Sequence, residues 1–166
     1  MVAVGSEVKI YGNSGLVIAK LQTSQQIVGM ISLAERQMIT IGEAGEVCFW
    51  DATELSKSFD LGLSIVQAVG NQNHKKGIFF ISFSDGYYEL RRLNLKTGAV
   101  KLFKKYKRAP SCMQLSADGN FLVVGCGKRL EVLSFKDGFS KQRYIFIYLF
   151  LVFLLMSKSL LSTFIQ

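Results

Sequence analysis

The sequence predicts an all-β protein made of repeated four-stranded antiparallel units, followed by an apolar segment outside the repeat. Two observations predict this fold class: strand-like segments recur about every forty residues, and Gly-containing turns keep the same place between them. The composition agrees, because 166 residues with 49% hydrophobic residues and one Pro suit a globular domain. A disordered or collagen-like chain is excluded.

The third strands of the units are the most regular segments. They are 7–11 (EVKIY), 46–50 (EVCFW), 89–93 (ELRRL) and 129–133 (RLEVL), and their last residues lie 39, 43 and 40 positions apart. Each is a short alternating or β-branched stretch. We treat them as equivalent positions of one repeat.

A second strand precedes each of these segments, so that the two form a β-hairpin. The second strands are 2–6, 38–42, 78–84 and 121–125. Turns with Gly at 43–45, 85–86 and 125–127 separate the last three pairs and supply the positive φ angles of tight hairpins.

First and fourth strands complete the units. First strands are expected at 27–33, 65–69 and 111–115, and fourth strands at 16–21, 55–59 and 99–103. Four strands in each forty-residue unit are typical of a β-propeller blade. The chain opens at a second strand and the repeat stops after a third strand, so we expect incomplete blades with two uncovered sheet faces.

Two stretches carry a resemblance to a known family: GEVCFWDA around Trp50 and Asp51, and LSADGNFLVVGCGKRLEVLSFKDG with its turn at Asp118 and Gly119. They resemble the WD-repeat β-propellers over about residues 1–138, which are four incomplete blades. Trp50-Asp51 is the one literal Trp-Asp pair, and the family's Gly-His dipeptide and usual structural histidine are absent. The resemblance implies a non-catalytic interaction scaffold with protein partners in a multi-subunit complex.

A narrower resemblance concerns blade order. A Lys-rich blade after the Trp-Asp repeat, followed by RAPSCMQLSADGNFLVVG, looks like the nucleolar WD repeat-containing protein 75 type of the U3 small-subunit processome. This resemblance implies a role in ribosomal RNA processing and small-subunit ribosome biogenesis, an intracellular location in the nucleus or nucleolus, and ribonucleoprotein partners.

The densest charge cluster is a candidate contact for RNA or an acidic partner. It consists of Lys101, Lys104, Lys105, Lys107 and Arg108, with His74, Lys75 and Lys76 in an earlier loop. Because Phe103 and Tyr106 are interleaved with these cations, the strand has the composition of a phosphate-binding surface. A solvated outer strand whose lysines discourage edge pairing explains the same residues. Both interpretations stay open.

Other conspicuous residues favour structural roles. We expect Trp50 to pack between neighbouring blades and Asp51 to cap a turn. Arg91 and Arg92 break the alternation of their strand, so one of them must face a polar environment or an inter-blade partner.

Enzymatic chemistry is not expected. The sequence has one His, and Cys48, Cys112 and Cys126 lack any CxxC or Cys/His spacing. Gly125-Cys-Gly127 lies between strands, with no helix after it to bind an anion. We therefore expect no catalytic residue, metal or cofactor.

The segment 139–166 differs from the rest of the chain. It carries three of the net eight positive charges and, at 144–156, a run of 13 apolar residues. A membrane-spanning helix needs about 20 residues, and an extension to Ile165 would bury Lys158 at a cost of about 3 kcal/mol. A membrane anchor, which would make the protein a membrane-tethered adaptor, a buried strand or helix, and translation past an exon end are the alternatives. We expect no membrane insertion.

Overall fold

The computed structural model describes residues 1–33, 37–70, 77–135 and 142–146, and in these ranges the chain forms strands, turns and loops. Predictions about His74, Lys75 and Lys76 concern residues outside the described ranges. Among the described residues, no helix has the length and hydropathy that a membrane crossing requires.

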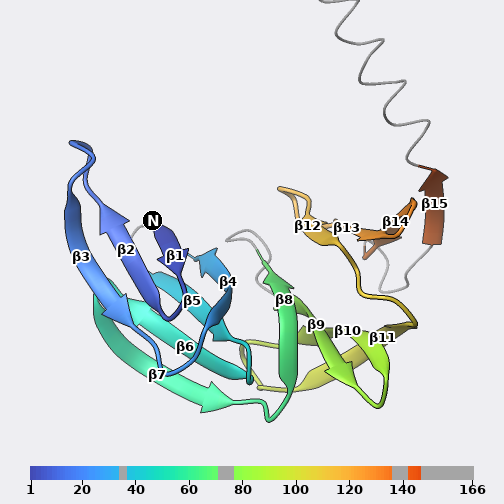
Figure 1. Cartoon of the computed structure of the whole chain (residues 1–166), viewed down its shortest axis with the longest axis horizontal. Helices are drawn as coiled ribbons and strands as arrows, with labels where there is room; N and C mark the ends of the chain where they lie inside the picture. Colours follow the sequence, from blue (N-terminus) through green and yellow to red (C-terminus); the bar gives the residue numbers. More distant parts are fainter. Residues whose placement is uncertain (34–36, 71–76, 136–141, 147–166) are drawn as a thin grey trace, which may run out of the picture.

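The strands form four antiparallel sheets, each a meander of neighbours in the chain (Figure 1). The first sheet contains β1 (Val2–Val4), β2 (Glu7–Tyr11) and β3 (Val17–Gln22). The second contains β4 (Ile27–Ser32), β5 (Gln37–Gly42), β6 (Glu46–Asp51) and β7 (Glu54–Asp60). The third contains β8 (Ser64–Val69), β9 (Ile78–Ser84), β10 (Tyr87–Leu93) and β11 (Val100–Tyr106). The fourth contains β12 (Cys112–Leu115), β13 (Phe121–Cys126), β14 (Arg129–Ser134) and β15 (Gln142–Phe146).

The predicted all-β repeat is confirmed. The four segments predicted to be equivalent lie in β2, β6, β10 and β14, each the third strand of its repeat unit. The first sheet has three strands in the described ranges, which correspond to the second, third and fourth strands of the repeat unit. Positive φ angles at Gly45 (104°) and Gly86 (77°) lie in the predicted hairpin turns. The alternation of apolar and polar residues, together with the Gly-containing turns, therefore predicted the positions of the strands correctly.

The last sheet continues past the predicted end of the repeat. β15 pairs with β14 in an antiparallel register, from Arg129 opposite Phe146 to Leu133 opposite Gln142. The expectation that this sheet stops at its third strand is therefore wrong. The physical reason is that β14 offers an unpaired edge, and Tyr144, Ile145 and Phe146 favour strands. The rest of the apolar run lies outside the described residues.

The sheets fan around their first strands in an open arc (Figure 1). β8 contacts both β4 and β12, and β1 contacts β4. Neighbouring sheets therefore pack face to face at three junctions, which we number from the first sheet onward.

Each junction has its own apolar core. Junction 1 is built from Val8, Leu21, Met38, Cys48 and Trp50. Junction 2 is built from Ile31, Ile39, Ile41, Val47, Ile65, Ala68, Ile78, Phe80 and Leu93. Junction 3 is built from Phe79, Ile81, Leu90, Tyr106, Met113, Leu115, Leu122, Val124 and Leu133. β9 serves two junctions, since its successive side chains point to opposite faces of the sheet.

The far face of the first sheet is uncovered, as the incomplete repeat predicts. Ala3 opposes Val8, which packs into junction 1, so Val2 and Val4 point to the other face. Val4 is 61% exposed, and Leu16 and Ile18 at the β2–β3 end are 70% and 68% exposed. This face of the first sheet therefore carries exposed apolar side chains.

Candidate functional site: a basic pocket at junction 3

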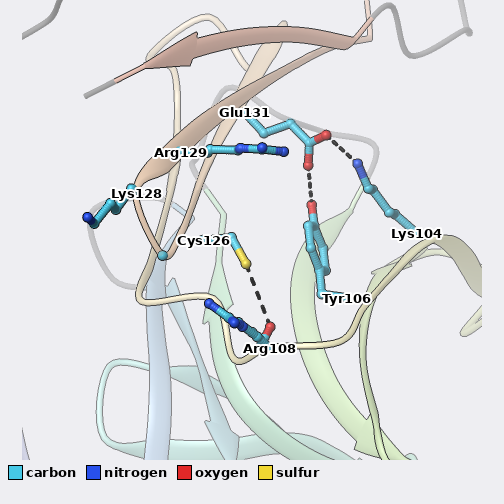
Figure 2. Close-up of a pocket in the computed structure, with 8 residues that line it drawn as sticks. Lys104, Tyr106, Arg108, Cys126, Lys128, Arg129 and Glu131 are labelled. Atoms are coloured by element: carbon cyan, nitrogen blue, oxygen red, sulfur yellow. Dashed lines mark hydrogen bonds and ion pairs between the residues drawn. The ribbon is translucent and has the colours of Figure 1, made fainter. Parts of the chain in front are cut away.

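A pocket of about 720 Å³ opens at junction 3, between the third and fourth sheets. It is lined by Lys104, Tyr106, Arg108, Cys126, Gly127, Lys128, Arg129 and Glu131 (Figure 2). Four cations and one carboxylate thus surround a space of the size that binds small ligands in proteins.

Local structure explains how the pocket forms. Lys128 lies in the β13–β14 turn, where Gly127 has a φ of 60° that suits a residue without a side chain. Arg108 lies in the loop after β11. The Cys126 thiol donates to the carbonyl oxygen of Arg108 (3.7 Å), and the Ser111 amide donates to the Gly125 carbonyl (2.8 Å). These bonds hold the loop beside the hairpin.

A buried carboxylate closes one wall of the pocket. The hydroxyl of Tyr106 donates to Glu131 Oε2 at 2.7 Å, and Lys104 Nζ forms an ion pair with Glu131 Oε1 (Figure 2). Glu131 belongs to β14 and is 4% exposed, whereas both partners belong to β11. The carboxylate therefore joins the third sheet to the fourth.

The predicted basic cluster is divided among several environments. Lys104 and Arg108 line the pocket. Lys105 Nζ lies 2.7 Å from Glu89 Oε1, and Lys101 Nζ lies 5.4 Å from the Phe103 ring centre. Lys107 is exposed in the loop that follows β11. The five cations therefore do not form one continuous surface.

Sequence reasoning gave no binding role to five of the eight residues that line the pocket. They belong to turns or strands of the fourth sheet and are Cys126, Gly127, Lys128, Arg129 and Glu131. A signal was present, because Glu131 lies two residues before the apolar Leu133 of a predicted strand, and residues i and i+2 of a strand share a face. A carboxylate on a face that packs against a neighbouring sheet needs a cationic or hydroxyl partner there.

A second buried carboxylate lies at the outer part of the third sheet. Glu89 is 2% exposed and pairs with Arg91 and Lys105, both in its own sheet. The ammonium of Lys105 and then the guanidinium of Arg91 lower the pKa of Glu89 below its usual range. Arg91 thus faces a polar environment, as expected, and Arg92 lies 5.5 Å from the Phe103 ring centre.

The residues of the repeat signature occupy a junction and two turns. Trp50 is 7% exposed in junction 1, and its indole Nε1 donates to Thr40 Oγ1 at 2.9 Å. Asp51 is exposed at the end of β6, where the chain turns into β7.

The Asp118-Gly119 turn is built around one carboxylate. Oδ1 of Asp118 accepts from the Ser116 hydroxyl at 2.6 Å and from the Asn120 amide at 3.0 Å. The Ser116 hydroxyl and the Asn120 donors lower the pKa of Asp118 to about 2. Gly119 takes the left-handed conformation, with a φ of 70°. Asp118 therefore shapes a turn.

The cysteines are three free thiols in different surroundings. Burial raises the pKa of Cys48 to about 11, so its thiol stays protonated at neutral pH. Cys112 is exposed, and Cys126 lines the pocket. Within the part of the chain that the structure describes, no group of three His, Cys, Asp or Glu side chains is placed to hold a metal ion.

Comparison with solved structures identifies the fold. The chain is similar to the β-propeller domain of Cps50 (Swd1) from Myceliophteria thermophila, with a TM-score of 0.61 and 17% identity over 84% of this chain and 48% of that chain. It is also similar to the WD40 β-propeller domain of Doa1, with a TM-score of 0.58 and 21% identity over 85% of this chain and 47% of that one. A third neighbour is BBS1N in complex with ARL6DN, with a TM-score of 0.58 and 15% identity over 87% and 48% of the two chains.

These likenesses establish a WD40-type propeller fold, and the chain spans about half the length of these solved structures. No protein-family model matches the sequence. The curated proteins provide no match either.

Proposed function

We propose that the protein is a non-catalytic scaffold that binds other proteins. The observation that carries this proposal is the pocket at junction 3, whose side chains suit the binding of charged groups. Tyr106 and Lys104 contact both oxygens of Glu131, which suits a structural role for this carboxylate. One structural neighbour was solved in complex with another protein, which supports a similar use of the fold here.

The setting that we propose is a ribonucleoprotein assembly of small-subunit ribosome biogenesis in the nucleolus. The blade order and the segment RAPSCMQLSADGNFLVVG support it, together with the net charge of +8, which suits an assembly rich in phosphate. Imaging of the tagged protein, with pre-ribosomal RNA intermediates measured after its depletion, tests this setting. A diffuse distribution with normal intermediates would remove it and leave the scaffold proposal standing.

Cross-linking mass spectrometry on the affinity-purified full chain tests the scaffold proposal. We expect stoichiometric protein partners, with lysine cross-links concentrated at Lys128 and Lys107 beside the pocket. Cross-links at Lys9 and Lys20 on the far face of the first sheet would still support a scaffold but would place the partner elsewhere. Folded protein that retains no stoichiometric partner would contradict the proposal.

A further inference from the structure

We infer that the pocket at junction 3 is a binding site for an acidic peptide segment of a protein partner. This inference rests on the proposed scaffold function and specifies its partner. Its basis is the charge of the lining, the division of the pocket between two sheets, and the position of the one aromatic ring in it.

The charge of the lining selects an anionic ligand. Lys104, Arg108, Lys128 and Arg129 contribute four positive charges against the single carboxylate of Glu131. Tyr106 and Lys104 already satisfy both oxygens of that carboxylate. Arg108 and Lys128 are both exposed, so carboxylates of a ligand can reach their charged groups.

The division of the cations between two sheets suits a ligand with more than one negative group. Arg108 comes from the loop after β11, whereas Lys128 and Arg129 come from the turn and start of the β13–β14 hairpin on the other side of the pocket (Figure 2). A segment with neighbouring Glu or Asp side chains can engage both sides at once.

The aromatic content favours a peptide over RNA. Recognition of single-stranded nucleic acid relies on exposed aromatic rings on which bases stack. Tyr106, the aromatic residue of this lining, is 7% exposed and its hydroxyl is bonded to Glu131. Phe103 lies outside the lining, and the Arg92 and Lys101 cations lie 5.5 and 5.4 Å from its ring centre. The pocket thus offers charge without a stacking surface.

Fluorescence anisotropy with a labelled hexaglutamate peptide tests the inference on the full chain. We expect saturable binding that weakens about tenfold in the double variant Arg108→Gln/Lys128→Gln, because two cations of the lining are removed. The matched control Lys101→Gln/Lys107→Gln removes the same charge outside the pocket and should change binding by less than about twofold. A hexaglutamine peptide should not bind.

A second readout needs no variant. Cys126 lines the pocket and Cys112 is exposed outside it, so the peptide should slow alkylation of Cys126 and leave the rate at Cys112 unchanged. Circular dichroism verifies that the variants fold. If the double variant does not fold, the exposed-turn variant Lys128→Glu replaces it, with an expected loss of about fivefold.

Three results would overturn the inference: equal weakening in both double variants, no hexaglutamate binding by folded protein, or tighter binding of an oligouridylate with the same dependence on Arg108 and Lys128. The last would assign the pocket to RNA. In each case, protein cross-links at Lys9 and Lys20 would still support the scaffold function, so the two proposals fail separately.

Discussion

Junctions 2 and 3 share the third sheet, and each has a buried glutamate beside an apolar core. Glu89 lies on the same face of β10 as Leu93, the face toward junction 2. It pairs with Arg91 and Lys105 of its own sheet. Glu131 at junction 3 finds Lys104 and Tyr106 in the neighbouring sheet. The first carboxylate braces a pair of adjacent strands, and the second links two sheets.

This difference has a structural consequence. A carboxylate that is satisfied within its own sheet leaves the opposing sheet free to pack apolar side chains. A carboxylate that is satisfied across the junction fixes charged groups between the sheets, and the pocket opens beside them. The placement of the partners therefore decides whether a buried carboxylate braces one sheet or links two sheets.

The largest expected effect compares the two apolar cores through adjacent residues of β9. Phe80 packs in junction 2 and Phe79 in junction 3, and both are fully buried. Substitution of either by Ala should lower the free energy of unfolding by about 3–5 kcal/mol, because it leaves a large cavity. Urea denaturation measures both. A loss below about 1 kcal/mol for Phe79→Ala alone would mean that polar contacts hold junction 3.

Substitution of the glutamates sharpens the comparison directly. Glu131→Gln should cost about 2 kcal/mol, because it weakens two charge-assisted contacts of a buried group. In a double-mutant cycle, Glu131→Gln should couple to Lys104→Met by about 1 kcal/mol or more. Coupling to Lys105→Met should stay within about 0.5 kcal/mol, since Lys105 pairs with Glu89. Equal coupling energies for Lys104 and Lys105 would contradict the claim that Glu131 pairs across the two sheets while Glu89 pairs within one sheet.

Junction 1 has a buried polar contact between uncharged groups, the hydrogen bond from Trp50 to Thr40. Trp50→Phe should cost about 1 kcal/mol, because it removes the indole donor and leaves the hydroxyl of Thr40 buried. In a Thr40→Val background the same substitution should be nearly neutral. A full cost in both backgrounds, measured by urea denaturation, would assign the loss to packing of the indole.

The smallest expected effect is the loss, at acid pH, of the stability that the ion pairs of Glu89 with Arg91 and Lys105 contribute. The pKa of Glu89 is lower in the folded protein than its ordinary 4.5. Its stabilisation is therefore complete above that value and disappears as the pH falls through the lower folded pKa. The difference in unfolding free energy between wild type and Glu89→Gln should shrink below about pH 4.5. A difference that is constant down to pH 2 would show that Glu89 is not held by Arg91 and Lys105.

The strands were predictable because their information is local. Alternation within 46–50 and Gly at turns such as 43–45 depend only on near neighbours, and the structure places strands and turns there. The partner of Glu131 was not predictable in this way. Lys104 lies 27 residues earlier in another sheet, and nothing local states which faces of two sheets will meet.

The basic cluster illustrates an inference that sequence alone did allow. Lys104 and Lys105 are consecutive in β11, so their side chains point to opposite faces of the sheet. The structure pairs one with Glu131 and the other with Glu89. The fourth strand of the last sheet was missed for a different reason. The apolar run from Tyr144 onward suggested a separate segment, and the open edge of β14 that recruits it is a tertiary feature.

The central position of β9 determines how the molecule opens. β9 is hydrogen-bonded along both edges, to β8 and β10, and its residues 78–81 are buried on both faces. Each of its paired amide hydrogens is bonded to β8 or to β10, and both adjacent junctions cover the strand, so exchange with solvent requires a large opening. The outer strand β7 is mostly exposed and is hydrogen-bonded along one edge, to β6. Deuterium uptake should therefore proceed inward from the periphery, and the slowest amides of β9 should report the free energy of global unfolding.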